Sequence, residues 1–276
     1  KCQGEMSRIP DVGNPWLDAG IVAYSTLNYR HDRAYWEKWF PADLISETFP
    51  GQIRKWFYSL LTMSTVMENR EPFKCCFSYA TLVDEKGEEM HKSKGNAIEF
   101  NEAADKMGVD VMRWMYCGAN ITQDFRFGYN LGDETRRRFI LPLWNVYSFF
   151  VTYANLDRWT PNGKPTTGAA LTPLDRWILS ELQALINTMT ERLDGYDPAA
   201  AVRAAEGFVD DLSNWYVRRS RRRFWKRESD DDKQAAYATL YTCLVTLSKL
   251  LAPFIPFVTE TMYQNLVRSQ DVGAPE

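Results

Sequence analysis

The stretch EEMHKSKGNAIEF, from Glu88 to Phe100, places two lysines around a serine, directly before a glycine and an asparagine. Ammonium groups in such a loop can meet the charge that develops on a phosphoryl group, and Gly95 would let the backbone approach a phosphate closely. The stretch lacks the Gly-x-x-x-x-Gly-Lys spacing of a P-loop. Its residues alone therefore leave two readings open, a polyphosphate site and a solvated turn.

A second stretch, NWYVRRSRRRFWKR, covers residues 214–227. On a helix its seven basic side chains spread over roughly two-thirds of the circumference. The remaining narrow seam, which could pack on a core, is Val217, Ser220 and Phe224. The interleaved aromatic residues are Trp215, Tyr216 and Trp225. Guanidinium groups neutralise phosphates and aromatic faces stack on unpaired bases, so the pattern favours nucleic-acid binding. The alternative is a solvated face balanced by the following ESDDDK.

The residues before about position 128 must hold the first stretch in place, and they mix strand and helix patterns. Phe73 to Val83 reads as an extended run that breaks at the turn around Lys86-Gly87. Residues 101–119 read as helix interrupted at Gly108. Upstream, a helical stripe consists of Trp56, Leu60, Met63 and Met67. Strand and helix in alternation predict an α/β unit.

From about Asp133 the pattern becomes nearly all helix. One helix is expected to start at Thr172 as N-cap, with Pro173 in its first position, and a second at Asp197-Pro198. The core stripe of the first is Ile178, Leu182, Leu185 and Met189. A third stripe consists of Tyr237, Leu240, Tyr241, Leu244, Leu247 and Leu251, and a shorter fourth of Val258, Met262 and Leu266. We predict an all-α bundle, with a loose linker at about 157–170.

Bulk properties narrow the classes of protein. The net charge is −3, so any nucleic-acid contact must come from a local patch. No apolar run approaches a membrane span, and the first residues do not read as a signal peptide. The five cysteines are scattered and odd in number, which favours free thiols in a reducing compartment. We therefore expect a cytoplasmic protein without membrane association.

The flanks of the first stretch carry a family resemblance. EMHKSKGN resembles the Lys-Met-Ser-Lys-Ser signature of class I aminoacyl-tRNA synthetases, which usually continues into x-Gly-Asn. The matching residues are Met90, Lys92, Ser93, Gly95 and Asn96. Glu89 and His91 depart from it, because they stand where the family has its first lysine and first serine.

Further segments resemble the same family in the same order. NPWLDAG is similar to its Trp-Phe-Asp-Ser-Gly element and keeps Trp16, Asp18 and Gly20. SETFPGQIRKWFYSLL resembles a helix start of isoleucyl-tRNA synthetases, with one extra residue after Glu47; the matches are Glu47, Gln52, Arg54, Trp56, Phe57 and Tyr58. GVDVMRW and DFRFG resemble segments that follow the signature. The resemblance covers nearly the whole chain and favours the isoleucyl enzymes, with the valyl and leucyl enzymes as close relatives and alternatives.

The resemblance implies a fold and an activity. It implies that residues 1–127 are the C-terminal half of a Rossmann-like α/β catalytic domain and that residues 128–276 are an anticodon-binding helical bundle. The implied activity is ATP-dependent activation of isoleucine, with Mg²⁺ in the full enzyme, and transfer to isoleucine tRNA. A monomer is expected.

The resemblance also assigns residues. The catalytic residues would be Lys92, on the departing pyrophosphate, and Ser93. ATP would be bound by Met90, Lys92, Ser93, Gly95 and Asn96. The amino-acid and adenylate pocket would be shaped by Trp16, Asp18, Glu47, Gln52 and Trp56. tRNA would be bound by Asn214, Trp215, Arg218, Arg219, Arg222, Arg223 and Trp225.

Some family elements are not found. The chain has only His31 and His91, and neither lies in a His-Ile-Gly-His-like context, so we expect a fragment that is inactive alone. His31 reads as a surface residue. Cys2 resembles one ligand of a zinc knuckle whose partners are absent, and tetrahedral zinc needs four ligands, so no metal site is expected. A stand-alone tRNA-binding protein, favoured by Glu89 and His91, and a generic helical scaffold are the competing hypotheses.

Overall fold

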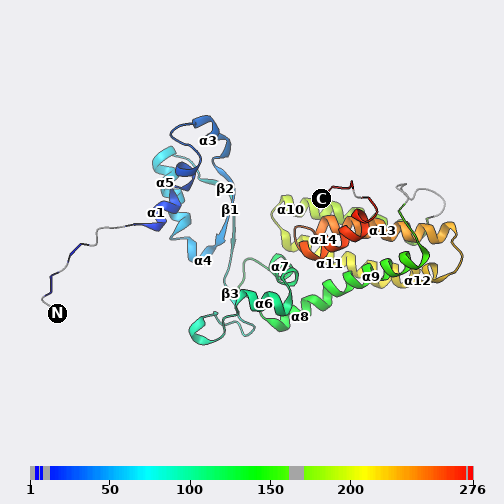
Figure 1. Ribbon diagram of the computed structural model, residues 1–276. Coiled ribbons are helices and arrows are strands. Elements are labelled where there is room, and N and C mark those ends of the chain that lie inside the picture. The colour runs from blue at the N-terminus through cyan, green and yellow to red at the C-terminus, as the bar shows by residue number, and fades with distance from the viewer. Residues whose placement is uncertain (1–3, 6, 9–12, 162–170, 272, 276) are drawn as a thin grey trace. The chain divides into compact units, whose positions relative to one another are not determined.

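The structure is a computed structural model that describes residues 4–5, 7–8, 13–161, 171–271 and 273–275. The chain divides into two compact units (Figure 1). Unit 1 consists of Lys1–Leu82 with Ile121–Phe125, and unit 2 of Val83–Asn120 with Arg126–Glu276.

Unit 1 is built on a parallel pair of strands joined by helices. Its elements are α1 (Pro15–Gly20), α2 (Val22–Thr26), α3 (Arg33–Trp39), β1 (Ala42–Thr48), α4 (Phe49–Gln52), α5 (Trp56–Glu68) and β2 (Phe73–Tyr79). β1 and β2 run parallel, in a register that pairs Ala42 with Phe73 and Thr48 with Tyr79. The connection through α4 and α5 makes a strand–helix–strand unit, so the predicted α/β character is confirmed.

Helix α1 packs closely against α5 in unit 1. The indole N–H of Trp56 donates to the carbonyl oxygen of Ala19 at 3.2 Å. A Cβ on Gly20 would lie 2.9 Å from the backbone oxygen of Ser59, so only glycine permits this approach. The buried face of α5 is Phe57, Leu60 and Ser64. The predicted stripe is therefore displaced around the helix: of its four residues only Leu60 is buried, Trp56 and Met63 are half-buried, and Met67 is exposed.

The first part of unit 2 carries the signature loop. Its elements are η1, one turn of 3₁₀ helix (Lys92–Lys94), α6 (Phe100–Met107), α7 (Val109–Cys117) and α8 (Tyr129–Thr135). The short strands β3 (Leu82–Val83) and β4 (Phe125–Arg126) form a second two-stranded sheet. The extended run expected from Phe73 to Val83 is thus interrupted after Tyr79. The predicted break at Gly108 is confirmed, where φ is +88° between α6 and α7.

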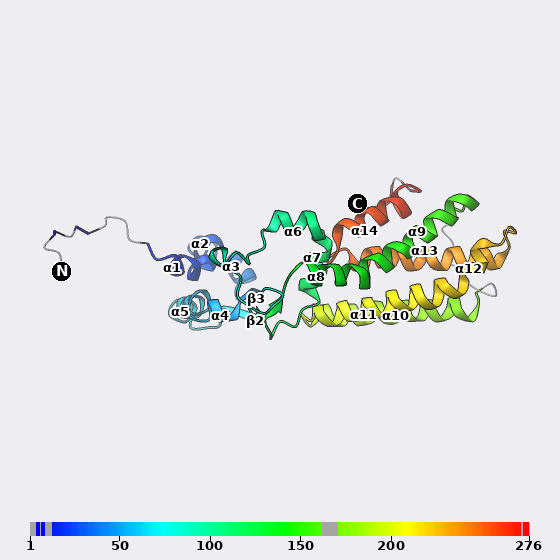
Figure 2. The same ribbon diagram turned by 90° about the horizontal axis from the view of Figure 1, so that it is seen from below.

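Long helices form the remainder of unit 2. They are α9 (Leu141–Asp157), α10 (Pro173–Asp194), α11 (Pro198–Asp210), α12 (Arg218–Trp225), α13 (Asp231–Leu251) and α14 (Pro256–Tyr263). π-helical turns at Arg136–Ile140, Asp211–Val217 and Gln264–Arg268 continue neighbouring helices, so α11 and α12 form one rod. α10 and α11 lie side by side in both views (Figure 2). The predicted linker falls partly on residues 162–170, which lie outside the described residues.

The helix starts in the bundle follow their predicted caps. The Thr172 hydroxyl accepts from the Asp175 amide, and the Asp175 carboxylate accepts from the Thr172 amide, which makes a capping box. Asp197 caps α11. All four predicted core residues of α10 are buried. Within the described part of the chain, no helix is long and apolar enough to cross a membrane.

Candidate functional site

The signature loop is exposed and ends in a left-handed residue. Lys92, Ser93 and Lys94 form the 3₁₀ turn, and Gly95 closes it with φ +72°. The amide of Gly95 donates to the carbonyl oxygen of Lys92 at 3.2 Å. Lys92–Gly95 are all exposed, while Met90 and Asn96 are half-buried. A loop of this kind offers two ammonium groups and open backbone to an approaching polyphosphate.

Asn96 fastens the loop to the preceding turn. Its side-chain oxygen accepts from the His91 amide at 2.9 Å, and its side-chain nitrogen donates to the Asp84 carboxylate at 2.9 Å. Asp84 also accepts from the amides of Lys86 and Glu88. These hydrogen bonds, first the one from Asn96 and then those from the backbone amides, lower the pKa of Asp84. Asn96 thus holds the base of the loop through its side-chain amide, while its predicted contact with ATP stays a proposal.

Replacing Asn96 with alanine should loosen the loop without unfolding the unit. The change removes the three side-chain hydrogen bonds of Asn96, with the His91 amide, the Asp84 carboxylate and the Glu89 carbonyl oxygen. Each is worth about 1 kcal/mol and the first protects the His91 amide directly, so that amide should exchange with solvent about 5- to 30-fold faster. Hydrogen exchange of peptides covering residues 85–100 measures this. Asn101→Ala, in the first turn of α6, is the matched control and should leave His91 unchanged. Equal exchange in both variants would contradict the role assigned to Asn96.

The two residues that depart from the family signature pair with each other. The His91 imidazole lies 3.2 Å from the Glu89 carboxylate, and both side chains are exposed. Within the described residues neither Lys92 nor Lys94 pairs with a carboxylate. The Glu89 carboxylate therefore contacts His91, and the ammonium groups of Lys92 and Lys94 remain exposed on the loop.

In unit 1, Glu47 and Gln52 lie where a parallel sheet places ligands. Glu47 is at the carboxyl end of β1, and its carboxylate accepts from the Thr48 amide at 2.7 Å. The Tyr79 hydroxyl lies 3.4 Å from the same oxygen; burial, then Glu47, raises the pKa of Tyr79. Gln52 accepts from the Trp56 amide at 3.4 Å and so caps α5. Ligands of open α/β sheets bind beyond the carboxyl ends of the strands.

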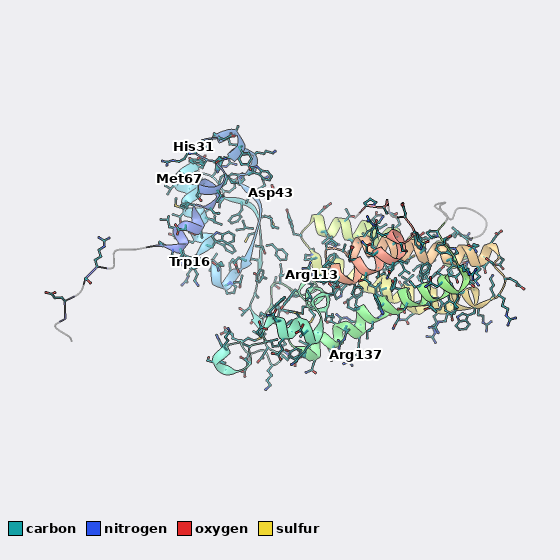
Figure 3. The ribbon with its side chains drawn as sticks, in the orientation of Figure 1. Trp16, His31, Asp43, Met67, Arg113 and Arg137 are labelled. Carbon is teal, nitrogen blue, oxygen red and sulfur yellow. The ribbon has the colours of Figure 1, made fainter. Side chains whose placement is uncertain are left out.

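Trp16 and Trp56 are brought to neighbouring helices. Trp16 lies exposed on α1, with the Lys55 ammonium 5.6 Å from its ring (Figure 3). Trp56 is half-buried and lines a cavity of about 240 Å³ together with Gly20 and Leu60. Asp18 is exposed, and the structure gives its carboxylate no hydrogen-bond partner among the described residues. The α1–α5 contact therefore places Trp16 beside Lys55 and Trp56 beside Ala19, with Gln52 at the start of α5. Glu47 stands at the strand end.

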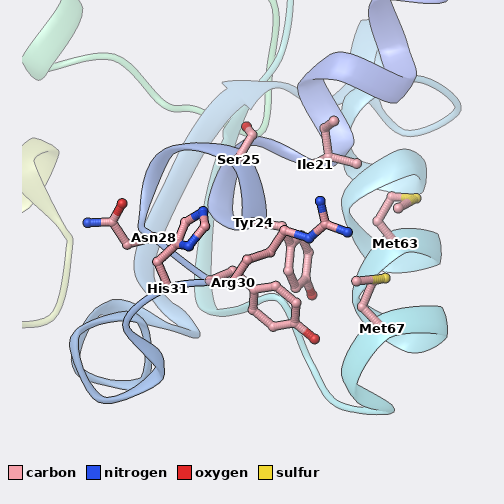
Figure 4. Close-up of a pocket in the computed structure, with 9 residues that line it drawn as sticks. Ile21, Tyr24, Ser25, Asn28, Arg30, His31, Met63 and Met67 are labelled. Atoms are coloured by element: carbon pink, nitrogen blue, oxygen red, sulfur yellow. The ribbon is translucent and has the colours of Figure 1, made fainter.

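A larger pocket in unit 1 was not anticipated from the sequence. Its volume is about 440 Å³, and it lies between the loop after α2 and helix α5 (Figure 4). Apolar side chains include Met63 and Met67, and polar ones include Asn28 and His31. His31 is exposed, as expected, but it faces this hollow. In the sequence Met63 and Met67 stand out only as members of a helical stripe, which does not indicate a pocket.

In unit 2 the Arg-rich helix divides into an exposed face and a buried seam. Trp215 and Trp225 are 51% and 54% exposed. The Arg219 guanidinium lies 5.1 Å from the Trp215 ring centroid. The exposed face comprises Asn214, Trp215, Arg218, Arg219, Arg221, Arg222 and Trp225. Within the described residues none of its arginines pairs with a carboxylate. We call this set the arginine face.

Arg223 departs from its predicted place on that face. Its side chain is 13% exposed and its guanidinium makes two bonds, at 2.7 and 2.8 Å, to the fully buried Asp175 carboxylate. The Tyr216 hydroxyl donates to the same carboxylate at 2.7 Å, so Tyr216 is also buried instead of facing bases. Asp232 pairs with Arg223 from α13. Because its donors are committed inside the bundle, we remove Arg223 from the proposed tRNA contacts.

The GVDVMRW segment proves to be a clamp within unit 2. Asp110 accepts from the Val258 amide at 2.7 Å and so caps α14. The Arg113 guanidinium donates to the carbonyl oxygens of Pro253 at 2.6 Å and Phe254 at 2.9 Å (Figure 3). The sequence identified this segment only by resemblance. Its structural role depends on the packing of α7 beside the junction of α13 and α14.

No metal-binding cluster occurs in the described ranges, where groups of three or more His, Cys, Asp or Glu side chains are absent. Cys2, the residue compared with a zinc ligand, lies outside the described residues.

Comparisons with known proteins place the chain in a class. Residues 1–128 match the family model "tRNA synthetases class I (I, L, M and V)", and residues 175–276 match "Anticodon-binding domain of tRNA ligase". Mycobacterium tuberculosis methionyl-tRNA synthetase in complex with methionyl-adenylate is similar in structure, with a TM-score of 0.74 at 19% identity over 90% of this chain and 48% of that one. A leucyl-tRNA synthetase–tRNA complex from Agrobacterium radiobacter has a TM-score of 0.67 at 18% identity, over 96% of this chain and 33% of that one. The chain belongs to the class I tRNA synthetases, and the predicted fold class is confirmed.

Within that class, the chain is similar in sequence to isoleucine–tRNA ligases. The isoleucine–tRNA ligase of Dehalococcoides mccartyi is 49% identical over 100% of this chain and 28% of its own length. That of Thermus thermophilus is 46% identical over 100% of this chain and 26% of its own length. The predicted resemblance to isoleucyl-tRNA synthetases is therefore confirmed. The chain spans about a quarter of the length of these relatives.

Proposed function

We propose that the chain supplies the signature loop and the anticodon-binding bundle of an isoleucine–tRNA ligase. The observation that carries this proposal is similarity to isoleucine–tRNA ligases along the whole chain, at 46–49% identity to two of them. The complete enzyme would join the isoleucine carboxylate to the α-phosphate of ATP, release pyrophosphate, and pass the acyl group to the terminal ribose of tRNA. A cytoplasmic location and a monomeric state stay predictions.

The exposed loop suits the first of these steps. Lys92 would stabilise the charge that grows on the leaving pyrophosphate, with Ser93 and Gly95 beside it and Met90 toward the adenine. Asn96 would hold the loop base while its tip closes on ATP. The Mg²⁺ of the complete reaction would be held chiefly by the ATP phosphates. Trp16, Asp18, Glu47, Gln52 and Trp56 would shape the isoleucine and adenylate pocket.

The arginine face suits the second substrate. Its exposed guanidinium groups can neutralise tRNA phosphates, while Trp215 and Trp225 offer faces to unpaired bases. Double replacement of Arg218 and Arg222 with alanine should weaken tRNA binding by about 10-fold or more and reduce the salt dependence by roughly two charges. Filter binding at several salt concentrations measures both. Arg192→Ala, in the last turn of α10, should change neither the affinity nor the salt dependence. An equal loss in this control would show that the net charge of the protein, and not the arginine face, determines tRNA binding.

A chimeric enzyme tests the catalytic part. This chain would replace the matching 280 residues of the Thermus thermophilus ligase, and ATP–pyrophosphate exchange would be followed with isoleucine, valine and leucine. We expect exchange that prefers isoleucine. Preference for valine or leucine would transfer the assignment to those enzymes.

Glu89 and His91 give one specific reason to consider a stand-alone tRNA-binding protein, and the same chimera decides. A folded chimera that binds tRNA but exchanges pyrophosphate only after Glu89→Lys and His91→Ser would support that second function. Exchange by the unaltered chimera excludes a degenerate loop.

A further inference from the structure

Glu85 ties the turn before the signature loop to the start of helix α8. Its carboxylate oxygen Oε1 accepts from the backbone amide of Asn130 at 2.8 Å and from that of Leu131 at 3.3 Å. The other oxygen, Oε2, accepts from the side-chain amide of Asn130 at 2.8 Å. The half-buried side chain of Glu85 is therefore held at both oxygens, and it satisfies two amide donors that the first turn of a helix leaves without an internal partner.

Gly128 leaves the space that this contact needs. It is buried, and its backbone is extended, with φ 175° and ψ 174°, a conformation open to any residue. A Cβ at this position would lie 2.2 Å from Cγ of Glu85 and 2.5 Å from its Oε1. The glycine is therefore required by the side chain of Glu85 and not by its own backbone angles. A methyl group here would displace the flexible Glu85 side chain without straining the chain.

The same turn holds the base of the signature loop. Asp84, the residue before Glu85, accepts from the side chain of Asn96 at 2.9 Å, and its own amide donates to the carbonyl oxygen of Glu88 at 2.8 Å. These hydrogen bonds close the loop at its base, while Lys92 lies exposed at the far end. Because one peptide bond joins Asp84 to Glu85, a change in the position of Glu85 moves the base of the loop.

Helix α8 gives Glu85 a rigid partner. α8 continues through the π-helical turn Arg136–Ile140 into α9, with helical backbone at both joins (Figure 1). Its middle packs closely on α6, because a Cβ on Gly132 would lie 3.0 Å from the sulfur of the buried Met107. An element fixed along its length moves little, so Glu85 fastens an exposed loop to a fixed part of unit 2.

We infer that Glu85 is a positioning residue for isoleucine activation: in the space left by Gly128 it fixes the base of the signature loop to α8, and so sets where Lys92 meets the departing pyrophosphate. The inference rests on the proposed function and adds a pair of residues to it, neither of which contacts a substrate. A displacement of about 1 Å at a reacting group is enough to slow catalysis strongly, so a residue that fixes the loop base has a kinetic effect.

Hydrogen exchange of the full chain tests the contact itself. Glu85→Ala removes three hydrogen bonds, so the amides in the first turn of α8 should exchange about 5- to 30-fold faster. The His91 amide, at the loop base, should exchange about 3- to 10-fold faster. Gly128→Ala keeps the carboxylate but takes its space, and should give the same increases. Adding Gly128→Ala to Glu85→Ala should then cause no further increase, because no side chain remains to be displaced.

Kinetics in the chimeric ligase test the positioning. Glu85→Ala should lower kcat for ATP–pyrophosphate exchange by about 10- to 100-fold and change the KM for isoleucine by less than about 2-fold, because the isoleucine pocket is untouched. Glu85→Gln keeps an oxygen for the two backbone amides and should restore kcat to within about 3-fold of the unaltered chimera. Gly128→Ala should match Glu85→Ala, and the double variant should match either. Glu88→Ala, which removes an exposed carboxylate from the same turn, is the matched control and should cost less than about 2-fold.

The outcomes separate the inference from the proposed function. Additive losses in the double variant, or an equal loss for Glu88→Ala, would overturn the inference, because neither depends on the seat of Glu85 at Gly128. If Glu85→Ala speeds exchange in α8 but leaves the His91 amide and kcat unchanged, Glu85 is only a helix cap, and the proposed function stands without it. If the unaltered chimera exchanges no pyrophosphate, the proposed function fails and the role of Glu85 in activation falls with it.

Discussion

Replacing Lys92 with alanine in the chimeric ligase is expected to lower the rate of isoleucine activation by about 100- to 1000-fold, with little change in the KM for isoleucine. A positioned charge that meets charge developing in the transition state is typically worth this much. Lys92 is exposed and has no carboxylate partner among the described residues, so its removal should not disturb the fold. ATP–pyrophosphate exchange at varied isoleucine concentration separates kcat from KM.

Lys86→Ala is the matched control for Lys92. Lys86 is an exposed lysine of the turn that Asp84 organises, close in sequence to the signature loop. Replacing Lys86 should lower kcat for isoleucine activation by less than about 3-fold, because solvent and salt screen the charge of an exposed lysine. Equal losses in kcat and in isoleucine affinity for Lys92→Ala would contradict its assignment to the pyrophosphate.

Replacing Asp175 with asparagine is expected to lower the free energy of unfolding by about 3–5 kcal/mol. The Asp175 carboxylate is fully buried and accepts from Arg223 and Tyr216, so the change leaves a largely buried guanidinium with only the more exposed Asp232 carboxylate as counter-charge. Urea unfolding followed by circular dichroism measures the loss. Glu102→Gln, which removes an exposed pair with Lys106 on α6, should cost less than about 1 kcal/mol.

The Asp175 effect should also depend on pH. Burial alone would raise the pKa of Asp175, but hydrogen bonds from Arg223, Tyr216 and Thr172 outweigh it and lower the pKa. A carboxyl whose pKa is depressed by folding contributes stability above its unfolded pKa and loses it as pH falls through the folded pKa. The difference between wild type and Asp175→Asn should therefore be largest near neutral pH and shrink below about pH 4. If the difference in the free energy of unfolding between the two proteins does not change with pH, the Asp175–Arg223 ion pair is not its cause.

Local rules were sufficient for the start and core of the bundle helices. The capping box at Thr172 needs only Asp175 three residues on, and the α10 stripe repeats every three to four residues. Both are properties of one helix, so the sequence of that helix determines them. The seam of Val217, Ser220 and Phe224 is buried for the same reason.

Partners distant in sequence were beyond such rules. A helical wheel places Arg223 among other arginines, and nothing near it in the chain indicates that the buried cap of α10 is its partner. The clamp of Arg113 on the carbonyl oxygens of Pro253 and Phe254 is likewise set by tertiary packing. A pocket of about 330 Å³ lined by Phe150, Trp159 and Tyr241 likewise combines α9, α13 and the π-helical turn Gln264–Arg268, so no single segment of the sequence indicates it.

In unit 1 the family resemblance predicts several site residues, and the structure gives two of them a local structural role. Gln52 caps α5, and Trp56 ties that helix to α1. These contacts give both residues a local structural role, while their contact with isoleucine or adenylate stays a proposal. The extra residue after Glu47 falls at the short helix α4, next to the strand end.

One measurement tests most directly whether the bundle reads isoleucine tRNA, as we propose. Binding of the full chain to isoleucine tRNA would be compared with binding to the same tRNA carrying a swapped anticodon, at low and at physiological salt. We predict that the native anticodon binds several-fold tighter and that this preference persists at the higher salt, because base contacts are less screened than phosphate contacts. Equal binding of both tRNAs, fading together as salt rises, would contradict the claim and leave the arginine face as a source of charge alone.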